Sequence, residues 1–251
     1  MKDKKTSWGN VAEWYDDLIQ GNRENYQRAV ILPNLMRLLD VKREEKILDI
    51  ACGQGFFTGV LAKNGAEAVG TDIAEELVAI AKKEHPKVPF FIAPADKLAF
   101  AKNAFFDKAI LVLAIQNIEN AYGVFAEAAR VLKSGGRLWM VLNHPAFRVP
   151  KASDWGWDEN AKTQYRRIDK YLSEARAKIQ MHPGENPSDV TVSFHRPLQF
   201  YFKGLNKNGF AVARLEEWIS HKKSALGPRS EAENAARKEI PMFLMLEAVK
   251  L

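Results

Sequence analysis

The chain has 251 residues, of which 47% are hydrophobic, and this is enough apolar sequence to bury the core of one large domain. The formal net charge of +6 comes from 37 basic and 31 acidic residues scattered along the chain, which favours a solvated mixed-charge surface over a nucleic-acid interface. The single cysteine, Cys52, excludes an intramolecular disulfide and a thiolate zinc cage, so we predict a cytoplasmic protein without a structural metal.

No segment has the length or apolarity of a membrane span. The longest uncharged apolar run, "AILVLAI" at 109–115, is too short to cross a bilayer, and the first residues lack the apolar stretch of a signal peptide. We therefore expect a soluble protein, present as a monomer or a homodimer.

The N-terminal part of the chain has apolar residues at helical spacing. From Trp8 onward this pattern predicts two helices that end near Asp40. We assign residues 1–42 to a helical cap.

The pattern then changes to short apolar runs separated by segments of helical length. The segments 55–65, 73–85 and 120–132 carry spaced apolar positions and end at turn signals. Alternating strands and helices predict a doubly wound α/β fold with a mostly parallel sheet, whose ligand lies at the carboxyl ends of the strands. The predicted strands are "KILDI", "EAVGTD", "PFFIA", "FDKAILVLAI", "GRLWMVLN", "FAVARLEEW" and "MFLMLEAVK".

Residues 144–196 interrupt this alternation. The segment contains prolines and several large aromatic residues, and its stretch 159–179 has the spacing of a helix. Because it is too short for a large core of its own, we predict an inserted lid over the ligand end of the sheet, within a single domain spanning 1–251.

A glycine-rich turn follows the first predicted strand. Gly53, Gly55 and Gly59 give the spacing GxGxxxG, which differs from the GxGxxG of dinucleotide-binding turns. Asp49 stands just before the turn, where a carboxylate repels a pyrophosphate but suits a ligand with a cationic amino-acid end. These features favour S-adenosylmethionine over a dinucleotide.

A second carboxylate ends the second strand. Asp72 lies 72 − 53 = 19 residues beyond Gly53, where an acidic side chain accepts hydrogen bonds from ribose hydroxyls. The alternatives are a helix N-cap for Asp72 and a buried polar strand end for Asp49.

The motifs "ILDIACGQG" and "VGTDI" resemble those of the class I S-adenosylmethionine-dependent methyltransferases, especially the small-molecule group similar to ubiquinone and menaquinone biosynthesis enzymes (methyltransferase type 11). The resemblance covers roughly residues 46–143. It implies a Rossmann-like sheet of seven strands, the last antiparallel, with the N-terminal helices folded over the cofactor.

The resemblance also implies positions that contact S-adenosylmethionine and its product S-adenosylhomocysteine. In the third motif the usual aspartate position is Pro94, and Asp96 is its substitute. The fourth strand implies that Gln116 and Asn117 lie near the acceptor. The implied cofactor-binding set is Asp49, Ala51, Gly53, Gly55, Asp72, Ile73, Ala95, Asp96, Leu113 and Tyr15.

Methyl transfer from a sulfonium is an in-line displacement that depends mainly on orientation and exclusion of water. A base is needed only when the acceptor must lose a proton, and His144 and His195 are candidates at the ligand end of the sheet. Either histidine has the alternative role of a structural group bonded to backbone.

The insertion carries the candidate acceptor-binding side chains. Its aromatic residues are suited to surrounding a planar acceptor, with simple packing of the lid as their alternative role. Its paired arginines are suited to holding an acidic group of the substrate, with solvent exposure as their alternative. The candidates are Trp155, Trp157, Tyr165 and Arg166, with Phe147 and Arg167 beside them.

Absent motifs favour a small-molecule acceptor. The fourth strand lacks an Asn-Pro-Pro-Tyr sequence, and Cys52 belongs to the glycine turn, which argues against methylation of nucleic-acid bases. Two alternatives stay open: methylation of RNA or protein, and a regulatory protein that binds S-adenosylmethionine without catalysis. Asp49 and the turn spacing argue against a dinucleotide oxidoreductase.

Overall fold

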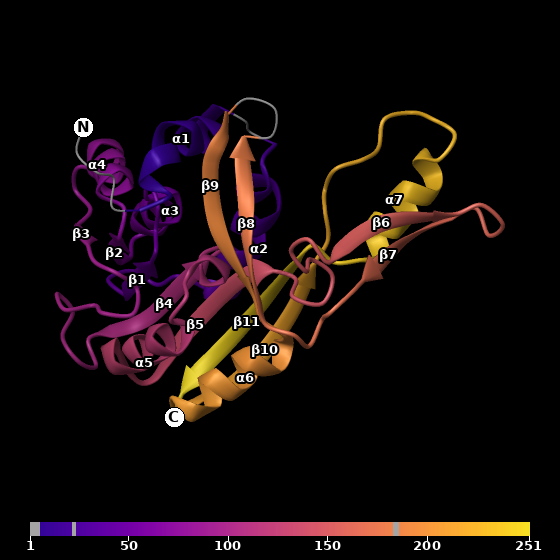
Figure 1. Ribbon diagram of the computed structural model, residues 1–251. Helices are drawn as coiled ribbons and strands as arrows, with labels where there is room; N and C mark the ends of the chain where they lie inside the picture. The colour runs from indigo at the N-terminus through magenta and orange to yellow at the C-terminus, as the bar shows by residue number, and fades with distance from the viewer. Residues whose placement is uncertain (1–5, 22–23, 183–185) are drawn as a thin grey trace.

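The computed structural model describes residues 6–21, 24–182 and 186–251 (Figure 1). Its central sheet has seven strands in the order β10-β11-β5-β4-β1-β2-β3. The strands β1 to β5 are parallel to one another, and β11 is antiparallel to both β5 and β10. The strands are β1 (Lys46–Ile50), β2 (Glu67–Asp72), β3 (Phe90–Ile92), β4 (Phe106–Val112), β5 (Leu132–Asn143), β10 (Phe210–Trp218) and β11 (Phe243–Lys250).

Helices cover both faces of this sheet. The helices predicted over 55–65, 73–85 and 120–132 are confirmed in type and place, as are the two N-terminal helices. The helices are α1 (Ala12–Gly21), α2 (Leu32–Leu39), α3 (Phe56–Lys63), α4 (Glu75–Glu84), α5 (Ala121–Val131), α6 (Leu198–Lys207) and α7 (Ser230–Glu239), with short turns η1 (Gly9–Val11), η2 (Gln27–Ile31) and η3 (Ile115–Asn117).

Alternate residues of the central strands enter two different hydrophobic clusters. Ile47 and Ile110 pack with Leu35 and Leu61 of α2 and α3, whereas Leu48 belongs to the cluster that contains α5 and α6. Because successive side chains of a strand point to opposite faces, each strand contributes to both layers. The doubly wound fold predicted from the sequence is thereby confirmed, including the antiparallel strand at the end of the chain.

The region 144–196 forms two β-hairpins rather than a helical lid. They consist of β6 (Ser153–Asp158) with β7 (Thr163–Ile168), and β8 (Ala175–His182) with β9 (Asn186–His195). The helix predicted over 159–179 is wrong. Lys162 and Lys170 have φ values of 52° and 54°, left-handed conformations that end an α-helix, and β7 alternates exposed and half-buried residues as a strand does.

The two hairpins lie in different places. Figure 1 shows β8 and β9 standing beside α1, whereas β6 and β7 form an arm that packs on α7. The insertion therefore does not form one layer over the ligand end of the sheet. Among the described helices, none combines the length and the apolar character needed to cross a membrane.

Candidate functional site

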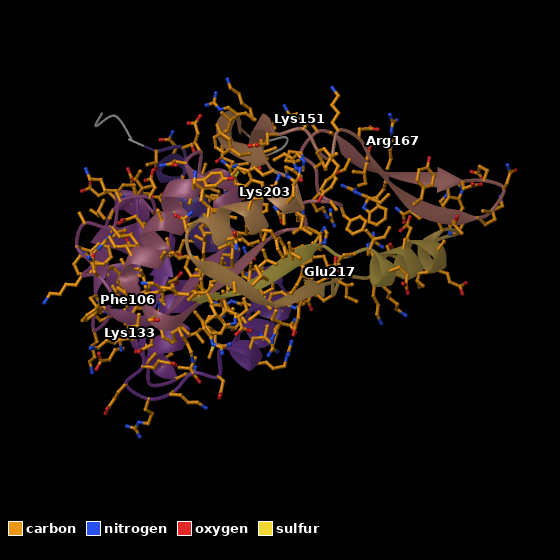
Figure 2. All side chains as sticks on the ribbon, turned by 90° about the horizontal axis from the view of Figure 1, so that it is seen from below. Phe106, Lys133, Lys151, Arg167, Lys203 and Glu217 are labelled. Atoms are coloured by element: carbon orange, nitrogen blue, oxygen red, sulfur yellow. The ribbon has the colours of Figure 1, made fainter. Side chains whose placement is uncertain are left out.

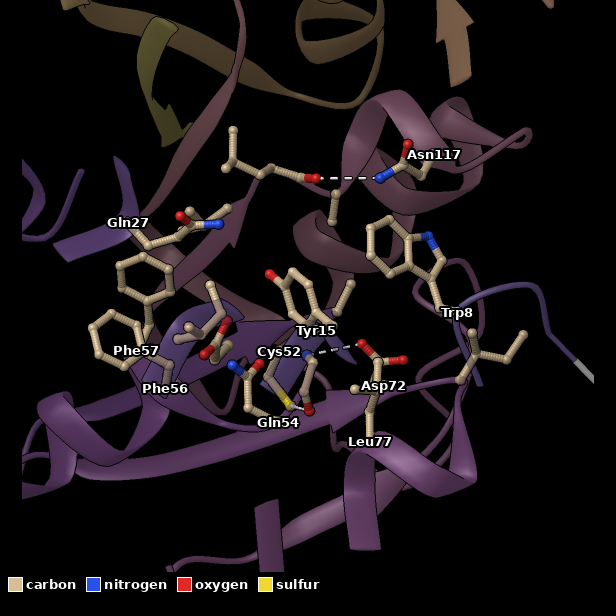
Figure 3. A pocket seen from close by; sticks show the side chains of 18 of the residues that line it. Trp8, Tyr15, Gln27, Cys52, Gln54, Phe56, Phe57, Asp72, Leu77 and Asn117 are labelled. Carbon is tan, nitrogen blue, oxygen red and sulfur yellow. Dashed lines mark hydrogen bonds between the residues drawn. The ribbon is translucent and has the colours of Figure 1, made fainter. Parts of the chain in front are cut away.

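A cavity of about 130 Å³ opens at the carboxyl ends of β1, β2 and β4 (Figure 3). We call it the main cavity. This is where a doubly wound sheet is expected to bind its ligand. The lining residues are Trp8, Tyr15, Ile19, Gln27, Asp49, Ala51, Cys52, Gly53, Gln54, Phe56, Phe57, Asp72, Ile73, Leu77, Val112, Leu113, Ala114, Asn117 and Ile118.

The turn after β1 brings backbone close to this space. Gly53 has φ of 56°, and a Cβ atom added there would lie 3.4 Å from the Tyr15 ring. Ala51 and Leu113 hold φ values of 56° and 53° although they are not glycines. Such left-handed residues cost on the order of 1 kcal/mol each, and they cluster at ligand sites where the surrounding structure holds them.

Asp72 connects the end of β2 to the glycine turn. Its Oδ2 accepts a hydrogen bond from the Gly53 backbone N–H at 2.9 Å, and its Oδ1 accepts one from the Ala74 N–H at 2.9 Å. Burial raises the pKa of the Asp72 carboxyl, and the hydrogen bonds oppose that rise. Each carboxylate oxygen keeps a further lone pair, so Asp72 can accept two ligand hydroxyls without losing the turn.

Asp49 is the second carboxylate of the main cavity. Its side chain is 1% exposed, and its Oδ2 accepts a hydrogen bond of 2.6 Å from the Thr58 hydroxyl on α3. Burial raises the pKa of Asp49 to about 7, opposed by that hydrogen bond. The Asp49 charge is therefore sensitive to a cation in the cavity.

The N-terminal helices supply one wall. The rings of Trp8 and Tyr15 meet edge to face with centroids 5.3 Å apart, and both line the cavity. Burial raises the pKa of Tyr15 to about 12, and a hydrogen bond with the Gln27 side chain opposes this. The Tyr15 phenol is therefore neutral over the physiological range.

The charged side chains in the described lining of the main cavity are all acidic. Among the described residues that line the main cavity there are two carboxylates and neither lysine nor arginine. Gln54 is 4% exposed, and within the described structure its Nε2 has no hydrogen-bond partner. The cavity thus suits a ligand with cationic groups and hydroxyls, plus an acceptor for the Gln54 amide, and it does not suit a pyrophosphate.

The structure brings together most, but not all, of the predicted cofactor residues. Gly55 lies outside the described lining and packs toward Phe90 instead. Ala95 is buried in the hydrophobic core, and Asp96 accepts a hydrogen bond of 2.8 Å from Asn120. The predicted cofactor residues found in the lining are Asp49, Ala51, Gly53, Asp72, Ile73, Leu113 and Tyr15, and the predicted acceptor residue Asn117 lies there too.

Several lining residues were not identified from the sequence. Ile19, Gln27 and Leu77 reach the cavity from helices, so only the tertiary structure places them. Phe56 and Phe57 directly follow the glycine turn in "GQGFF", and that position was an available signal. Gln54, between the two glycines, was another.

A second, smaller pocket of about 30 Å³ contains two other predicted residues, Gln116 and His195. The side-chain amides of Gln116 and Asn117 both donate to the Leu113 carbonyl, at 2.8 and 3.3 Å. Gln116 lines the second pocket and Asn117 the main cavity. The η3 turn therefore separates the two spaces.

The two candidate histidines have different surroundings. The Nδ1 atom of His144 accepts from the Ala146 N–H at 3.2 Å, so its Nε2 carries the proton and donates to Glu217 at 2.7 Å. Both nitrogens are therefore used, and His144 lines neither the main cavity nor the second pocket. Figure 2 shows Glu217 on the side of the sheet toward the β6–β7 arm.

His195 has one nitrogen committed to the protein backbone. Its Nε2 donates to the Tyr171 carbonyl at 2.7 Å, because a carbonyl can only accept. In the neutral ring Nδ1 is then the proton acceptor, and His195 lines the second pocket.

The aromatic residues predicted to surround the acceptor pack within the β6–β7 arm and against α7, which is the alternative role given to them above. Trp155 packs on the Arg166 guanidinium, and Trp157 lies 4.6 Å from the Arg229 guanidinium beside α7. Tyr165 packs over Gly156 within the same hairpin. These side chains complete the arm, and they are absent from the described linings of the main cavity and the second pocket.

Comparison with known proteins supports this reading of the main cavity. Residues 48–140 match a family described as a methyltransferase domain. A demethylmenaquinone methyltransferase from Chlorobaculum parvum is 32% identical over 141 residues, which cover 55% of this chain and 58% of that protein. The biotin biosynthesis bifunctional protein BioHC from Cellvibrio japonicus is 34% identical over 165 residues, which cover 63% of this chain and 31% of that protein.

Solved structures extend the likeness beyond this segment. An S-adenosylmethionine-dependent methyltransferase from Mesorhizobium loti has a TM-score of 0.72 at 26% identity, covering 90% of this chain and 100% of that chain. A glycopeptide N-methyltransferase complexed with S-adenosylmethionine has a TM-score of 0.59 at 16% identity, covering 88% and 92%, and shares the fold. Residues 48–140 match the methyltransferase domain, and the chain is similar in fold to S-adenosylmethionine-dependent methyltransferases of known structure.

Proposed function

We propose that the protein transfers the methyl group of S-adenosylmethionine to a small-molecule acceptor. The observation that carries this proposal is the main cavity itself, with two buried carboxylates and no basic side chain among its described lining residues. The small-molecule acceptor is supported by likeness to a demethylmenaquinone methyltransferase, of which this chain spans 58%.

The residues present fit the cofactor. Asp72 has lone pairs for the ribose hydroxyls, and Asp49 supplies negative charge for the ammonium and sulfonium groups. The unpartnered Nε2 of Gln54 is a donor for the carboxylate of the methionine part. Ile73 and Leu113 offer apolar surface for the adenine ring.

When bound, S-adenosylmethionine supplies a methyl group on an activated leaving group. The chain then has to align the acceptor with that methyl and keep water out. Trp8, Tyr15, Phe56 and Phe57 wall the cavity with aromatic surface suited to excluding water. If the acceptor must lose a proton, we assign the base to Nδ1 of His195, since both nitrogens of His144 are engaged.

The cofactor assignment is tested by calorimetric titration with S-adenosylmethionine, S-adenosylhomocysteine and NADH. We expect the first two to bind and NADH not to bind, because a pyrophosphate meets two carboxylates. Turnover is then measured as formation of S-adenosylhomocysteine with a panel of small acceptors. Binding of NADH alone would overturn the proposal, and cofactor binding without turnover on any acceptor would leave a binding protein.

The pH dependence of cofactor binding follows from Asp49. Its pKa in the folded protein, about 7, lies above the ordinary value of 3.8. Between pH 3.8 and pH 7 the ligand-free folded state therefore keeps a proton on Asp49 that the unfolded state has released. The contribution of Asp49 to stability is therefore fully present below the unfolded pKa and is lost as pH rises toward 7. A bound cation favours the ionised carboxylate, so we expect affinity for S-adenosylmethionine to rise with pH toward 7 and then level off.

The expected slope is at most about tenfold in affinity per pH unit, because one proton is released. Titration in buffers of different ionisation enthalpy measures that proton directly. The matched variant Asp49→Asn should bind more weakly and lose the slope. A slope unchanged in Asp49→Asn would assign the titration to another group.

A further inference from the structure

The second pocket contains an arginine, Arg148, for which the described residues supply no carboxylate partner. We propose that this pocket binds the carboxylate group of the methyl acceptor, with Arg148 as the ionic partner, so that the acceptor is a small hydroxy- or aminocarboxylic acid. This inference rests on the proposed function and names the substrate class for the same site. The argument depends on Arg148, Arg196, Gln116 and the position of the pocket beside the main cavity.

Arg148 is half-buried in the loop that follows β5. Its backbone N–H donates to the His144 carbonyl at 2.8 Å, whereas no described residue gives its guanidinium a hydrogen bond or an ion pair. Burial lowers the pKa of Arg148, and the positive charge of Arg166 lowers it further. A half-buried cation beside a second cation is costly, and a bound anion offsets that cost.

The neighbouring arginines are already engaged. Arg196 is 4% exposed and donates to the backbone carbonyls of Ile115, Ile118 and Glu119 at 2.6 to 3.2 Å. Arg166 donates to the Phe147 carbonyl and to Ser153. Arg196 therefore fixes β9 to the η3 turn, and Arg148 is left to meet a ligand.

The size of the pocket limits what enters it. A volume of about 30 Å³ holds roughly two water molecules, since each needs at least about 10–15 Å³ by this measure. That space suits one planar carboxylate and not a whole substrate. Arginine pairs well with such a group because its N–H donors match the two oxygens.

Gln116 indicates that the acceptor molecule also carries a hydrogen-bond donor, apart from its carboxylate. Its Nε2 is bonded to the Leu113 carbonyl, and its Oε1 is buried without a partner in the described structure. A buried carbonyl oxygen needs a hydrogen-bond donor, which a carboxylate does not provide. A hydroxyl or amine of the acceptor would supply it.

The position of Gln116 connects this chemistry to the main cavity. It precedes Asn117, which lines the main cavity, and both amides hold the same Leu113 carbonyl. In this proposal, a molecule anchored by its carboxylate at Arg148 reaches past Gln116 and η3 toward the bound cofactor. The group that Gln116 orients is the heteroatom nearest to methyl transfer.

The test uses the full chain saturated with S-adenosylhomocysteine and measures binding of small probes by NMR titration. The probes are mandelate, 3-hydroxyphenylacetate and 3-aminobenzoate, each paired with its primary amide, and 3-hydroxybenzylphosphonate. We expect at least one acid to bind about tenfold or more tightly than its amide, because the amide loses the ionic pair with Arg148.

Two variants locate the effect, and one serves as a matched control. Arg148→Gln should weaken acid binding about tenfold or more and leave amide binding nearly unchanged. Gln116→Glu places a carboxylate in the pocket and should weaken acid binding even if Arg148→Gln fails to fold. Arg43→Gln changes an exposed arginine just before β1, at the opposite end of the strand, and should change neither affinity.

The outcomes separate this inference from the proposed function. If the unmodified chain does not bind S-adenosylhomocysteine, the proposed function itself is contradicted. If S-adenosylhomocysteine binds normally, three results would overturn only the carboxylate assignment. These are equal affinities for every acid and its amide, no binding of any probe, and acid binding that neither pocket variant changes. Tighter, Arg148-dependent binding of the phosphonate also overturns it, in favour of a phosphoryl group.

Discussion

Replacing Asp72 with asparagine is expected to weaken S-adenosylhomocysteine binding by about thirtyfold or more. Hydrogen bonds from hydroxyls to a charged acceptor contribute about 1.5–3 kcal/mol each, and about 1.4 kcal/mol corresponds to a factor of ten. The asparagine also turns an N–H group toward a backbone donor, since Gly53 and Ala74 each donate to one Asp72 oxygen. The turn that shapes the cavity is therefore loosened as well.

Calorimetric titration of Asp72→Asn measures the loss, and Asp96→Asn decides between two assignments. The sequence resemblance gives Asp96 a cofactor role, whereas the structure holds Asp96 against Asn120 and outside the described lining. We expect Asp96→Asn to keep its affinity within about twofold. Equal losses in both variants would restore the sequence-based role of Asp96, and unchanged affinity in Asp72→Asn would remove the ribose role.

The sequence predicts the part of the site that depends on local backbone. Asp49, Gly53 and Asp72 end or follow parallel strands, and the carboxyl ends of such strands meet at one edge of the sheet. Short strands between helices leave little freedom in where these residues lie. Their assembly around one cavity therefore follows from strand order and chain length.

The rest of the site depends on tertiary contacts that no local pattern encodes. Gln27 reaches the cavity from η2 in the N-terminal region, and Arg148 reaches the second pocket from the loop after β5. The helical spacing of 159–179 was misleading because Lys162 and Lys170 adopt left-handed turns and the flanking residues pair as strands. In this segment, strand pairing within the two hairpins, rather than local helical spacing, determines the secondary structure.

Gly55 shows how packing, rather than ligand contact, constrains the glycine turn. Its φ is 81°, and an added Cβ would lie 2.9 Å from the Phe90 ring and 3.0 Å from the Ala81 Cβ. Gly209 has a similar φ of 78°, with nothing within 4 Å of an added Cβ. Substitution by alanine therefore costs the same left-handed backbone strain at both glycines, but only at Gly55 does the added Cβ atom also clash with neighbouring side chains.

We expect Gly55→Ala to lower the free energy of unfolding by about 2–4 kcal/mol and Gly209→Ala by only about 1 kcal/mol. Left-handed alanine accounts for roughly 1 kcal/mol in both variants, and overpacking adds about 1–3 kcal/mol at Gly55 alone. Urea unfolding at equilibrium measures both values, provided that the slopes of the transitions stay equal. Similar losses in the two variants would mean that Phe90 moves aside at little cost, so that backbone conformation alone would require glycine at this position.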